Sequence, residues 1–232
     1  MKTIILLAGQ ATRMRPLSSY LNKGMIPVHG RPLLERVITK LARQGFTDLL
    51  VAVTMFPEQL AHYFGDGTRF GVRLQWVPRP EPSQTAGEVH ALREWLVADE
   101  PFVVHYGDIL TDLDLPGMVR QHQATAAIAT LGLVTGVPVH AGVATLGEDG
   151  RVTAFREKPP LDLACNAGVY VLSPQALDYC GPGKDFGNHV FPEMVAAGED
   201  VRGYLDREAY WMDVGRLSDL DEASELMAKW EP

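Results

Sequence analysis

The sequence contains few of the features that mark secreted or membrane-spanning proteins. Its 232 residues include two cysteines, Cys165 and Cys180, without C-x-x-C spacing or a matching histidine cluster. This predicts inert buried thiols rather than a disulfide or a metal site. No apolar run approaches the roughly 20 residues that span a bilayer. The N-terminal apolar run is shorter than that of a signal peptide, and Arg13 follows it closely. We therefore expect a cytoplasmic protein without membrane insertion.

An excess of positive charge is also missing. The chain carries 21 Lys and Arg residues against 29 Asp and Glu residues, a formal net charge of -8. Binding to a nucleic-acid backbone needs a surplus of cations that displaces counterions, so we expect no nucleic-acid partner. Seven histidines show no metal-ligand spacing, and no serine or cysteine lies in a nucleophile elbow. The sequence therefore predicts neither a zinc enzyme nor a hydrolase of that type.

Strand-like and helix-like segments alternate through the first half of the chain. This alternation predicts an α/β fold with a mostly parallel sheet and helices on its faces. No repeat or long linker divides the chain, whose length suits one substantial core. The expected strands are Ile4–Leu7, Leu49–Val53, Val72–Val77 and Phe102–His105, and the expected helices are Leu33–Gln44, Pro57–Phe64 and Gly87–Val97.

The pattern changes after Val134, where short apolar segments follow one another across Gly, Pro and Asp turns. Such segments predict antiparallel or mixed strand pairing. The expected strands are Ala127–Val134, Gly142–Leu146, Val152–Phe155, Ala167–Leu172, Val201–Leu205 and Tyr210–Met212. The expected helices are Asp114–Gln123, Pro174–Tyr179, Phe191–Ala197 and Leu217–Lys229.

A loop rich in small and cationic residues follows the first expected strand. Gly9 permits close backbone approach, Thr12 offers a hydroxyl, and Arg13 and Lys23 supply positive charge. Because ligands of parallel α/β sheets bind beyond the carboxyl ends of the strands, this loop indicates an anion site. It matches neither G-x-G-x-x-G nor a Walker A loop. A solvated surface loop could have the same composition.

Two aspartates follow apolar runs that lie far apart in the sequence. Asp108 ends the segment Tyr106-Gly107-Asp108, and Asp213 lies in Trp211-Met212-Asp213-Val214-Gly215. One or two carboxylates together with substrate phosphates are the usual ligands of Mg²⁺ in phosphate chemistry. Helix caps and turns are the alternative roles for both aspartates.

Further polar residues follow the expected hairpin. Glu157 and Asn166 could bind hydroxyl groups, and Lys158 could neutralise a phosphate. Each residue taken singly also suits an exposed hairpin surface.

Seven segments in order resemble the sugar-phosphate nucleotidyltransferases, also called nucleotide-sugar pyrophosphorylases. They are LLAGQATRMRPLSSYLNKGMIPVHGRPLL, SQTAGEV, HYGD, FREKP, NAGVYV, DFGNHVFPEM and YWMDVG, and they cover nearly the whole chain. The resemblance implies a Rossmann-like, glycosyltransferase-A-like fold with a smaller β-rich half. We expect a single domain over residues 1–232, with a nucleotide-binding half at about 1–134 and a sugar-phosphate-binding half at about 135–232.

The resemblance also implies roles for residues that match the family motifs. Arg13, Lys23 and Asp108 would be catalytic, and Asp108 and Asp213 would hold Mg²⁺. The residues implied to bind the nucleotide are Leu7, Ala8, Gly9, Thr12, Arg13, Gln84, Thr85, Ala86 and Gly87. Those implied to bind the sugar phosphate are Glu157, Lys158 and Asn166.

The implied reaction joins a nucleoside triphosphate and a sugar 1-phosphate, with release of pyrophosphate, and serves cell-surface polysaccharide biosynthesis. The short length and the DFGN segment favour GTP or UTP with a mannose-, heptose- or glucose-like phosphate, as in the mannose, heptose and muramic acid enzymes. Two alternatives remain: a cytidylyltransferase acting on a sugar or choline-like phosphate, and a catalytically silent nucleotide-sugar-binding subunit. A homo-oligomer is also left open.

The chain departs from the family pattern at five positions. The family usually has glycine at the positions of Gln10, Ala11 and Gln84, and proline at that of Asn22. Glu88 follows the base-pocket segment. These departures concern the shape of the phosphate loop and the choice of base.

Overall fold

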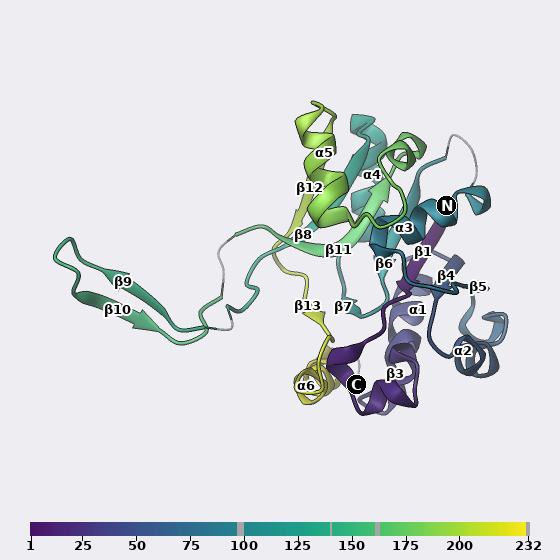
Figure 1. Cartoon of the computed structure of the whole chain (residues 1–232), viewed down its shortest axis with the longest axis horizontal. Helices are drawn as coiled ribbons and strands as arrows, with labels where there is room; N and C mark the ends of the chain where they lie inside the picture. Colours follow the sequence, from purple (N-terminus) through teal and green to yellow (C-terminus); the bar gives the residue numbers. More distant parts are fainter. Residues whose placement is uncertain (97–99, 140, 161–162, 231–232) are drawn as a thin grey trace.

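A seven-stranded sheet runs through the computed structural model, which describes residues 1–96, 100–139, 141–160 and 163–230. The strand order is β12-β8-β11-β6-β1-β4-β5 (Figure 1). The strands are β1 (Lys2–Leu7), β4 (Asp48–Val53), β5 (Arg73–Pro78), β6 (Phe102–Tyr106), β8 (Ala129–Val134), β11 (Cys165–Leu172) and β12 (Val201–Asp206).

The sheet is mixed and mostly parallel, as the sequence predicts. Strands β6, β1, β4 and β5 run parallel, and so do β8 and β12. Strand β11 lies between β6 and β8 and is antiparallel to both. The last third of the chain therefore contributes to the middle of the sheet, and the two expected halves share one sheet.

Alternate residues of the strands pack against helices on opposite faces of this sheet. Ile5 and Leu7 of β1 belong to the apolar core beneath α1, α2, α4 and α6, whereas Ile4 and Leu6 belong to the core beneath α3 and α5. This period-two alternation follows from strand geometry, and it buries both faces of β1. The helices are α1 (Leu33–Arg43), α2 (Pro57–Phe64), α3 (Gln84–Ala91), α4 (Leu115–Thr125), α5 (Phe191–Ala196) and α6 (Asp219–Trp230).

A two-stranded antiparallel sheet joins the end of β6 to the C-terminal segment. Strand β7 (Ile109–Thr111) pairs with β13 (Trp211–Asp213), and Asp213 lies opposite Ile109. The backbone N–H of Val214 donates to the Asp108 carbonyl at 2.9 Å. This pairing brings two distant aspartates to the same edge of the main sheet.

Strands β9 (Val143–Leu146) and β10 (Val152–Arg156) form an arm that projects away from the rest of the molecule (Figure 1). Its apolar side chains Leu146, Val152 and Phe155 are each at least 60% exposed. The sequence predicts both strands but not their separation from the core. Apolar residues in a strand-like segment do not identify the surface, if any, that covers them.

Two predicted helical segments differ from the structure, and one helical turn was not predicted. The helix expected at Gly87–Val97 begins earlier and ends at Ala91, and a 3₁₀ turn, Arg93–Trp95, follows it. Residue 97 lies outside the described residues. The segment expected at Pro174–Tyr179 is a 3₁₀ turn, Pro174–Asp178, and Phe186–Val190 forms a π-helical turn directly before α5. Tertiary hydrogen bonds and local turn geometry, which hydrophobic periodicity does not report, decide these boundaries. The short hairpin of β2 (Pro27–Val28) and β3 (Arg31–Pro32) also went unpredicted.

Both cysteines are free thiols. Cys180 is buried, and burial raises the pKa of its thiol to about 12, whereas Cys165 is half-buried. A thiol that stays protonated is a poor nucleophile and a poor metal ligand, which agrees with the role predicted for Cys180. Among the described residues, no helix combines the length and apolar character needed to cross a membrane.

Candidate active site

The loop after β1 turns sharply around Ala11. Ala11 has φ of 47°, in the left-handed region, and a 3₁₀ turn over Thr12–Met14 follows it. The hydroxyl of Ser18 donates to the Ala11 carbonyl at 2.8 Å and holds the turn. A positive φ explains why glycine suits this position in related sequences, since an alanine here is strained.

Asn22 positions the lysine that follows it. Its Oδ1 accepts a 2.8 Å hydrogen bond from the N–H of Gly24, and its own N–H donates to Oε1 of Gln59 at 2.8 Å. Its side-chain amide also donates to the Met55 carbonyl. A proline at this position has no N–H, so the bond to Gln59 accounts for asparagine at a site where the family usually has proline.

Lys23, held in this way, contacts Asp108 directly. Its Nζ lies 2.6 Å from Oδ2 of Asp108, and the two side chains are 12% and 29% exposed. Charge-assisted hydrogen bonds of this length are among the stronger polar contacts in proteins. The structure thus brings together two of the three residues predicted to be catalytic.

Asp213 and Arg13 meet on the same side of the sheet. A Cβ added to Gly215 would lie 3.2 Å from Nη2 of Arg13 and 3.2 Å from Oδ1 of Asp213. Burial raises the pKa of the Asp213 carboxyl, the Asp108 charge adds to the rise, and Lys23 and Arg13 oppose it. Arg13, Lys23, Asp108 and Asp213 therefore form one charged cluster.

This cluster contains the features of a site for a divalent cation. Oδ1 of Asp213 is buried and has no hydrogen-bond partner in the described part of the chain. Residues 1–96, 100–139, 141–160 and 163–230 contain no group of three or more His, Cys, Asp or Glu side chains that could hold a metal alone. Two carboxylates with one unsatisfied oxygen fit an ion such as Mg²⁺ whose remaining ligands are water and substrate phosphates.

Two neighbouring cavities open beside the cluster, and they share Leu6, Gly9 and Asp108. One cavity of about 260 Å³ is lined by Leu6, Leu7, Gly9, Ala11, Thr12, Arg13, Lys23, Asp108 and Gly215. The other, of about 340 Å³, is lined by Leu6, Ala8, Gly9, Gln10, Pro82, Gln84, Thr85, Glu88, Tyr106 and Asp108. The predicted phosphate-loop residues therefore lie around the first cavity, and Gln84 and Thr85 line the second. Both volumes approach those of small-molecule sites.

Gln84 adopts φ of 59°, which again is a conformation that glycine adopts without strain. Thr85 accepts a 3.1 Å hydrogen bond at Oγ1 from the N–H of Phe186. Ala86 and Gly87 are buried, do not line either cavity, and donate their N–H groups to the Lys184 carbonyl at 3.1 and 3.0 Å. Their backbone anchors the helix that presents Gln84 and Thr85.

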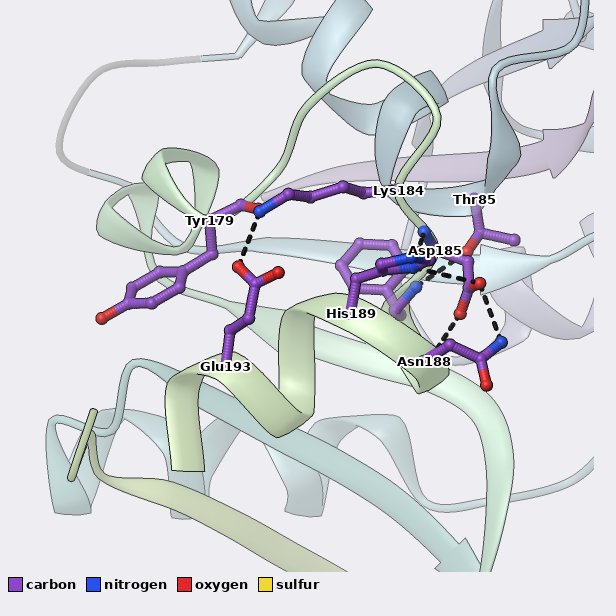
Figure 2. Close-up of polar contacts among 8 residues, drawn as sticks. Thr85, Tyr179, Lys184, Asp185, Asn188, His189 and Glu193 are labelled. Atoms are coloured by element: carbon purple, nitrogen blue, oxygen red, sulfur yellow. Dashed lines mark hydrogen bonds and ion pairs between the residues drawn. The ribbon is translucent and has the colours of Figure 1, made fainter. Parts of the chain in front are cut away.

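The loop that receives α3 is held by polar contacts of its own (Figure 2). Nζ of Lys184 lies 2.6 Å from Oε2 of Glu193, and Asp185 accepts hydrogen bonds from the N–H and the side-chain amide of Asn188 at 2.6 and 2.9 Å. Figure 2 shows Thr85 beside Asp185. The DFGN segment thus forms a support for the wall of the larger cavity.

The residues predicted to bind the sugar phosphate lie elsewhere. Glu157 and Lys158 are exposed at the base of the β9–β10 arm, and neither lines the two cavities. The Asn166 amide donates to the hydroxyl of Tyr170 at 2.9 Å, and its Oδ1 accepts the N–H of Gly168. In this structure Asn166 stabilises the irregular start of β11.

Several cavity residues were not assigned roles from the sequence. Tyr106 and Pro82 line the larger cavity, and Glu88, noted there only as a departure, lines it as well. A third cavity of about 230 Å³ shares Arg13 with the smaller one and is lined in part by Trp211, Asp213 and Arg216. The sequence offered one signal for these two residues: Tyr106 lies close to Asp108 in the chain, and Pro82 lies close to Gln84.

The chain with this site matches a known family along nearly its whole length. The family model described as Nucleotidyl transferase matches residues 2–229. The chain belongs to this family. A UTP–glucose-1-phosphate uridylyltransferase of Synechocystis is 32% identical over 96% of the chain, and a mannose-1-phosphate guanylyltransferase of Mycobacterium tuberculosis is 32% identical over 95% of it. Both are sugar-phosphate nucleotidyltransferases, as the ordered motifs predict.

A solved structure has the same fold as this chain. HddC from Yersinia pseudotuberculosis, solved in complex with GMP-PN, superposes with a TM-score of 0.78 at 21% identity, over 97% of this chain and 99% of HddC. The predicted glycosyltransferase-A-like sheet is therefore confirmed. The chain spans 62% of the Synechocystis protein and 63% of the Mycobacterium protein.

Proposed function

We propose that the protein transfers a nucleotidyl group from a nucleoside triphosphate, GTP or UTP in preference, to a mannose-, heptose- or glucose-like 1-phosphate. The products are a nucleotide sugar and pyrophosphate. The observation that carries this proposal is the convergence of Arg13, Lys23, Asp108 and Asp213 beside two adjoining cavities. Membership of the family and the two relatives that use UTP and mannose 1-phosphate support the same reaction class.

The chemistry needs charge neutralisation more than proton transfer. An oxygen of the sugar 1-phosphate attacks the α-phosphorus of the triphosphate, the new P–O bond forms, and the bond to the pyrophosphate oxygen breaks. The attacking oxygen is already anionic near neutral pH, so no general base is required. Arg13 and Lys23 reduce the repulsion between the two polyanions and align the attack, which is how phosphoryl-transfer sites usually act.

Asp108 and Asp213 would hold Mg²⁺ in the proposed enzyme. Oδ1 of Asp213, which is buried and has no hydrogen-bond partner among the described residues, supports this assignment. When bound, Mg²⁺ supplies positive charge to the phosphate oxygens at the reacting centre. Lys23 donates to Asp108 in this structure, so the lysine can exchange this carboxylate for a phosphate oxygen once substrate binds.

Glu157, Lys158 and Asn166 remain the proposed contacts of the sugar phosphate. Because Glu157 and Lys158 lie outside the two cavities, this role requires the base of the arm to approach the bound sugar. A Lys158→Met variant tests it, since the KM for the sugar 1-phosphate should rise more than the KM for the triphosphate. Equal changes in both would remove Lys158 from the site.

A substrate panel tests the proposed reaction. We expect Mg²⁺-dependent release of pyrophosphate from at least one pairing of GTP, UTP, CTP, ATP or dTTP with mannose, glucose or heptose 1-phosphate. Preference for CTP, or activity with phosphocholine, would replace the proposed substrates by the cytidylyl alternative. Binding of nucleotide without turnover across the panel would favour the silent regulatory alternative. The free thiols accord with a reducing compartment, and we assign the reaction to the cytoplasm.

A further inference from the structure

An ion pair with one buried partner, Glu88, closes the segment that forms one wall of the larger cavity. Nε of Arg79 lies 2.7 Å from Oε2 of Glu88, and the two side chains are 23% and 3% exposed. Arg79 directly follows β5, and Glu88 lies on α3. The pair therefore joins the two ends of the segment that carries Pro82, Ser83 and Gln84.

The second carboxylate oxygen of Glu88 binds the backbone of the same segment. Oε1 of Glu88 accepts a 2.6 Å hydrogen bond from the backbone N–H of Ser83. Ser83 precedes α3, but its side chain does not cap the helix; its Oγ accepts the N–H of Gly183 at 3.3 Å. Glu88 is thus the residue that fixes the backbone immediately before Gln84.

Stability alone does not account for this arrangement. Burying the Glu88 charge is costly, and replacing an ion pair of this kind with apolar side chains of similar volume is often neutral or stabilising. Gln84, directly after Ser83, has a left-handed backbone conformation that glycine adopts without strain. Strained residues of this kind are typical of functional sites, and Gln84 lines the cavity together with Pro82 and Glu88.

We infer that the Arg79–Glu88 pair sets the nucleobase preference of the cavity by holding Pro82 and Gln84, which line it, in the conformation that contacts the base. Arg79 and Glu88 act as positioning residues, and Gln84 supplies an amide that can donate and accept hydrogen bonds. This inference rests on the proposed function. A site shaped to pair with one set of donors and acceptors rejects bases that leave them unpaired.

Binding of five nucleotides tests the inference without knowledge of the sugar. Dissociation constants of GTP, UTP, CTP, ATP and dTTP are measured by calorimetry for the whole chain and for the variants Glu88→Gln, Arg79→Met and Gln84→Gly. We expect the ratio between the tightest and the second-tightest nucleotide to fall about tenfold in Arg79→Met and Gln84→Gly, within the range for loss of one specific contact. Glu88→Gln should reduce the ratio less, because its amide oxygen can still accept the N–H of Ser83.

Two further variants separate positioning from general support of the fold. Arg79→Lys keeps the charge and should restore part of the ratio that Arg79→Met loses. Arg202→Gln removes an exposed pair with Asp200 and should leave the ratio unchanged. Equal weakening of all five nucleotides in the Arg79 and Gln84 variants would overturn the inference, and so would equal affinities in the unmodified protein. Failure of the unmodified protein to bind any triphosphate would instead overturn the proposed function.

Discussion

Lys23 and Asp108 form a 2.6 Å ion pair across 85 residues of sequence. The lysine comes from the loop after β1, and the aspartate follows β6, the parallel neighbour of β1. The carboxyl ends of adjacent parallel strands thus bring a cation and an anion to the edge where α/β proteins bind ligands.

Removal of the Lys23 charge should impair catalysis more than folding. We expect Lys23→Met to lower kcat by roughly 10²- to 10³-fold, the usual loss when one preorganised donor to a developing charge is removed. Steady-state assays of pyrophosphate release measure this effect. Lys2→Met is the matched control, because Lys2 starts β1, the strand before the loop of Lys23, and its Nζ lies 3.8 Å from Oδ2 of Asp48. A comparable loss in the control would argue against a specific role for Lys23.

Loss of the Asp213 charge should remove the response to Mg²⁺ without destabilising the chain. Burial raises the pKa of this carboxyl, so the ionised form is disfavoured in the ion-free protein. We expect Asp213→Asn to have an equal or higher Tm in EDTA and to lose the increase in Tm that MgCl₂ with a nucleoside triphosphate causes. Asp221→Asn, on the exposed face of α6, should keep that increase. An unchanged Mg²⁺ response in Asp213→Asn would place the ion elsewhere.

Ala11→Gly should stabilise the protein. Ala11 has φ of 47°, where a side chain costs about 1 kcal/mol that glycine avoids. Urea unfolding should therefore show a gain of up to about 1 kcal/mol with catalytic activity retained. Ala228→Gly, in the exposed helical part of α6, should lose about 1 kcal/mol. A loss in Ala11→Gly similar to that of the control would show that the left-handed conformation carries no strain.

Asn22→Pro should destabilise the loop that holds Lys23. It removes the N–H bonded to Gln59 and the side chain that caps the next turn, and these losses together cost about 2–3 kcal/mol. Gln59→Met removes the same backbone bond and should cost less. Turnover should fall in both variants, because Lys23 loses its support. Normal stability and activity in both would mean that the loop is held by its remaining contacts.

Stability should decline in mild acid because of His105. Burial lowers the pKa of this histidine to about 4, from an ordinary value of 6.5. Between these values the unfolded chain binds a proton that the folded chain does not, so stability falls as the pH drops. From pH 7 to pH 5 the loss is about 2 kcal/mol from this group. His105→Asn should show a correspondingly smaller decline in urea unfolding; an identical decline would assign the effect to other groups.

Much of the fold could be predicted from local patterns. The apolar residues Ile4–Leu7 are buried on both sides, and the helical spacing of Leu33–Gln44 matches α1 to within one residue at its C-terminal end. Pairing between β7 and β13 could not be predicted in this way, because three-residue strands have no clear periodicity. The start of α3 could not be predicted from periodicity either, because it depends on hydrogen bonds that the first turn of α3 donates to the Lys184 carbonyl.

The charged cluster was predictable only through the ordered family motifs. Asp108 and Asp213 taken singly resemble ordinary turn residues, and the sequence contains no information on their distance. Glu157 and Lys158 lie at the base of the arm and do not line the two cavities, so their role in binding the sugar phosphate stays a prediction. The strained backbone at Ala11 and Gln84 gives a physical reason for glycine at these two positions in related sequences.

The position of β11 between β6 and β8 has a consequence for synthesis on the ribosome. Strands β1, β4, β5 and β6 emerge first and can pair with one another, but one edge of β6 stays open until residues 165–172 have been translated. An unpaired edge of a buried, apolar strand is a template for pairing with other chains. The nascent chain therefore passes through a period in which protection of the β6 edge decides between folding and aggregation.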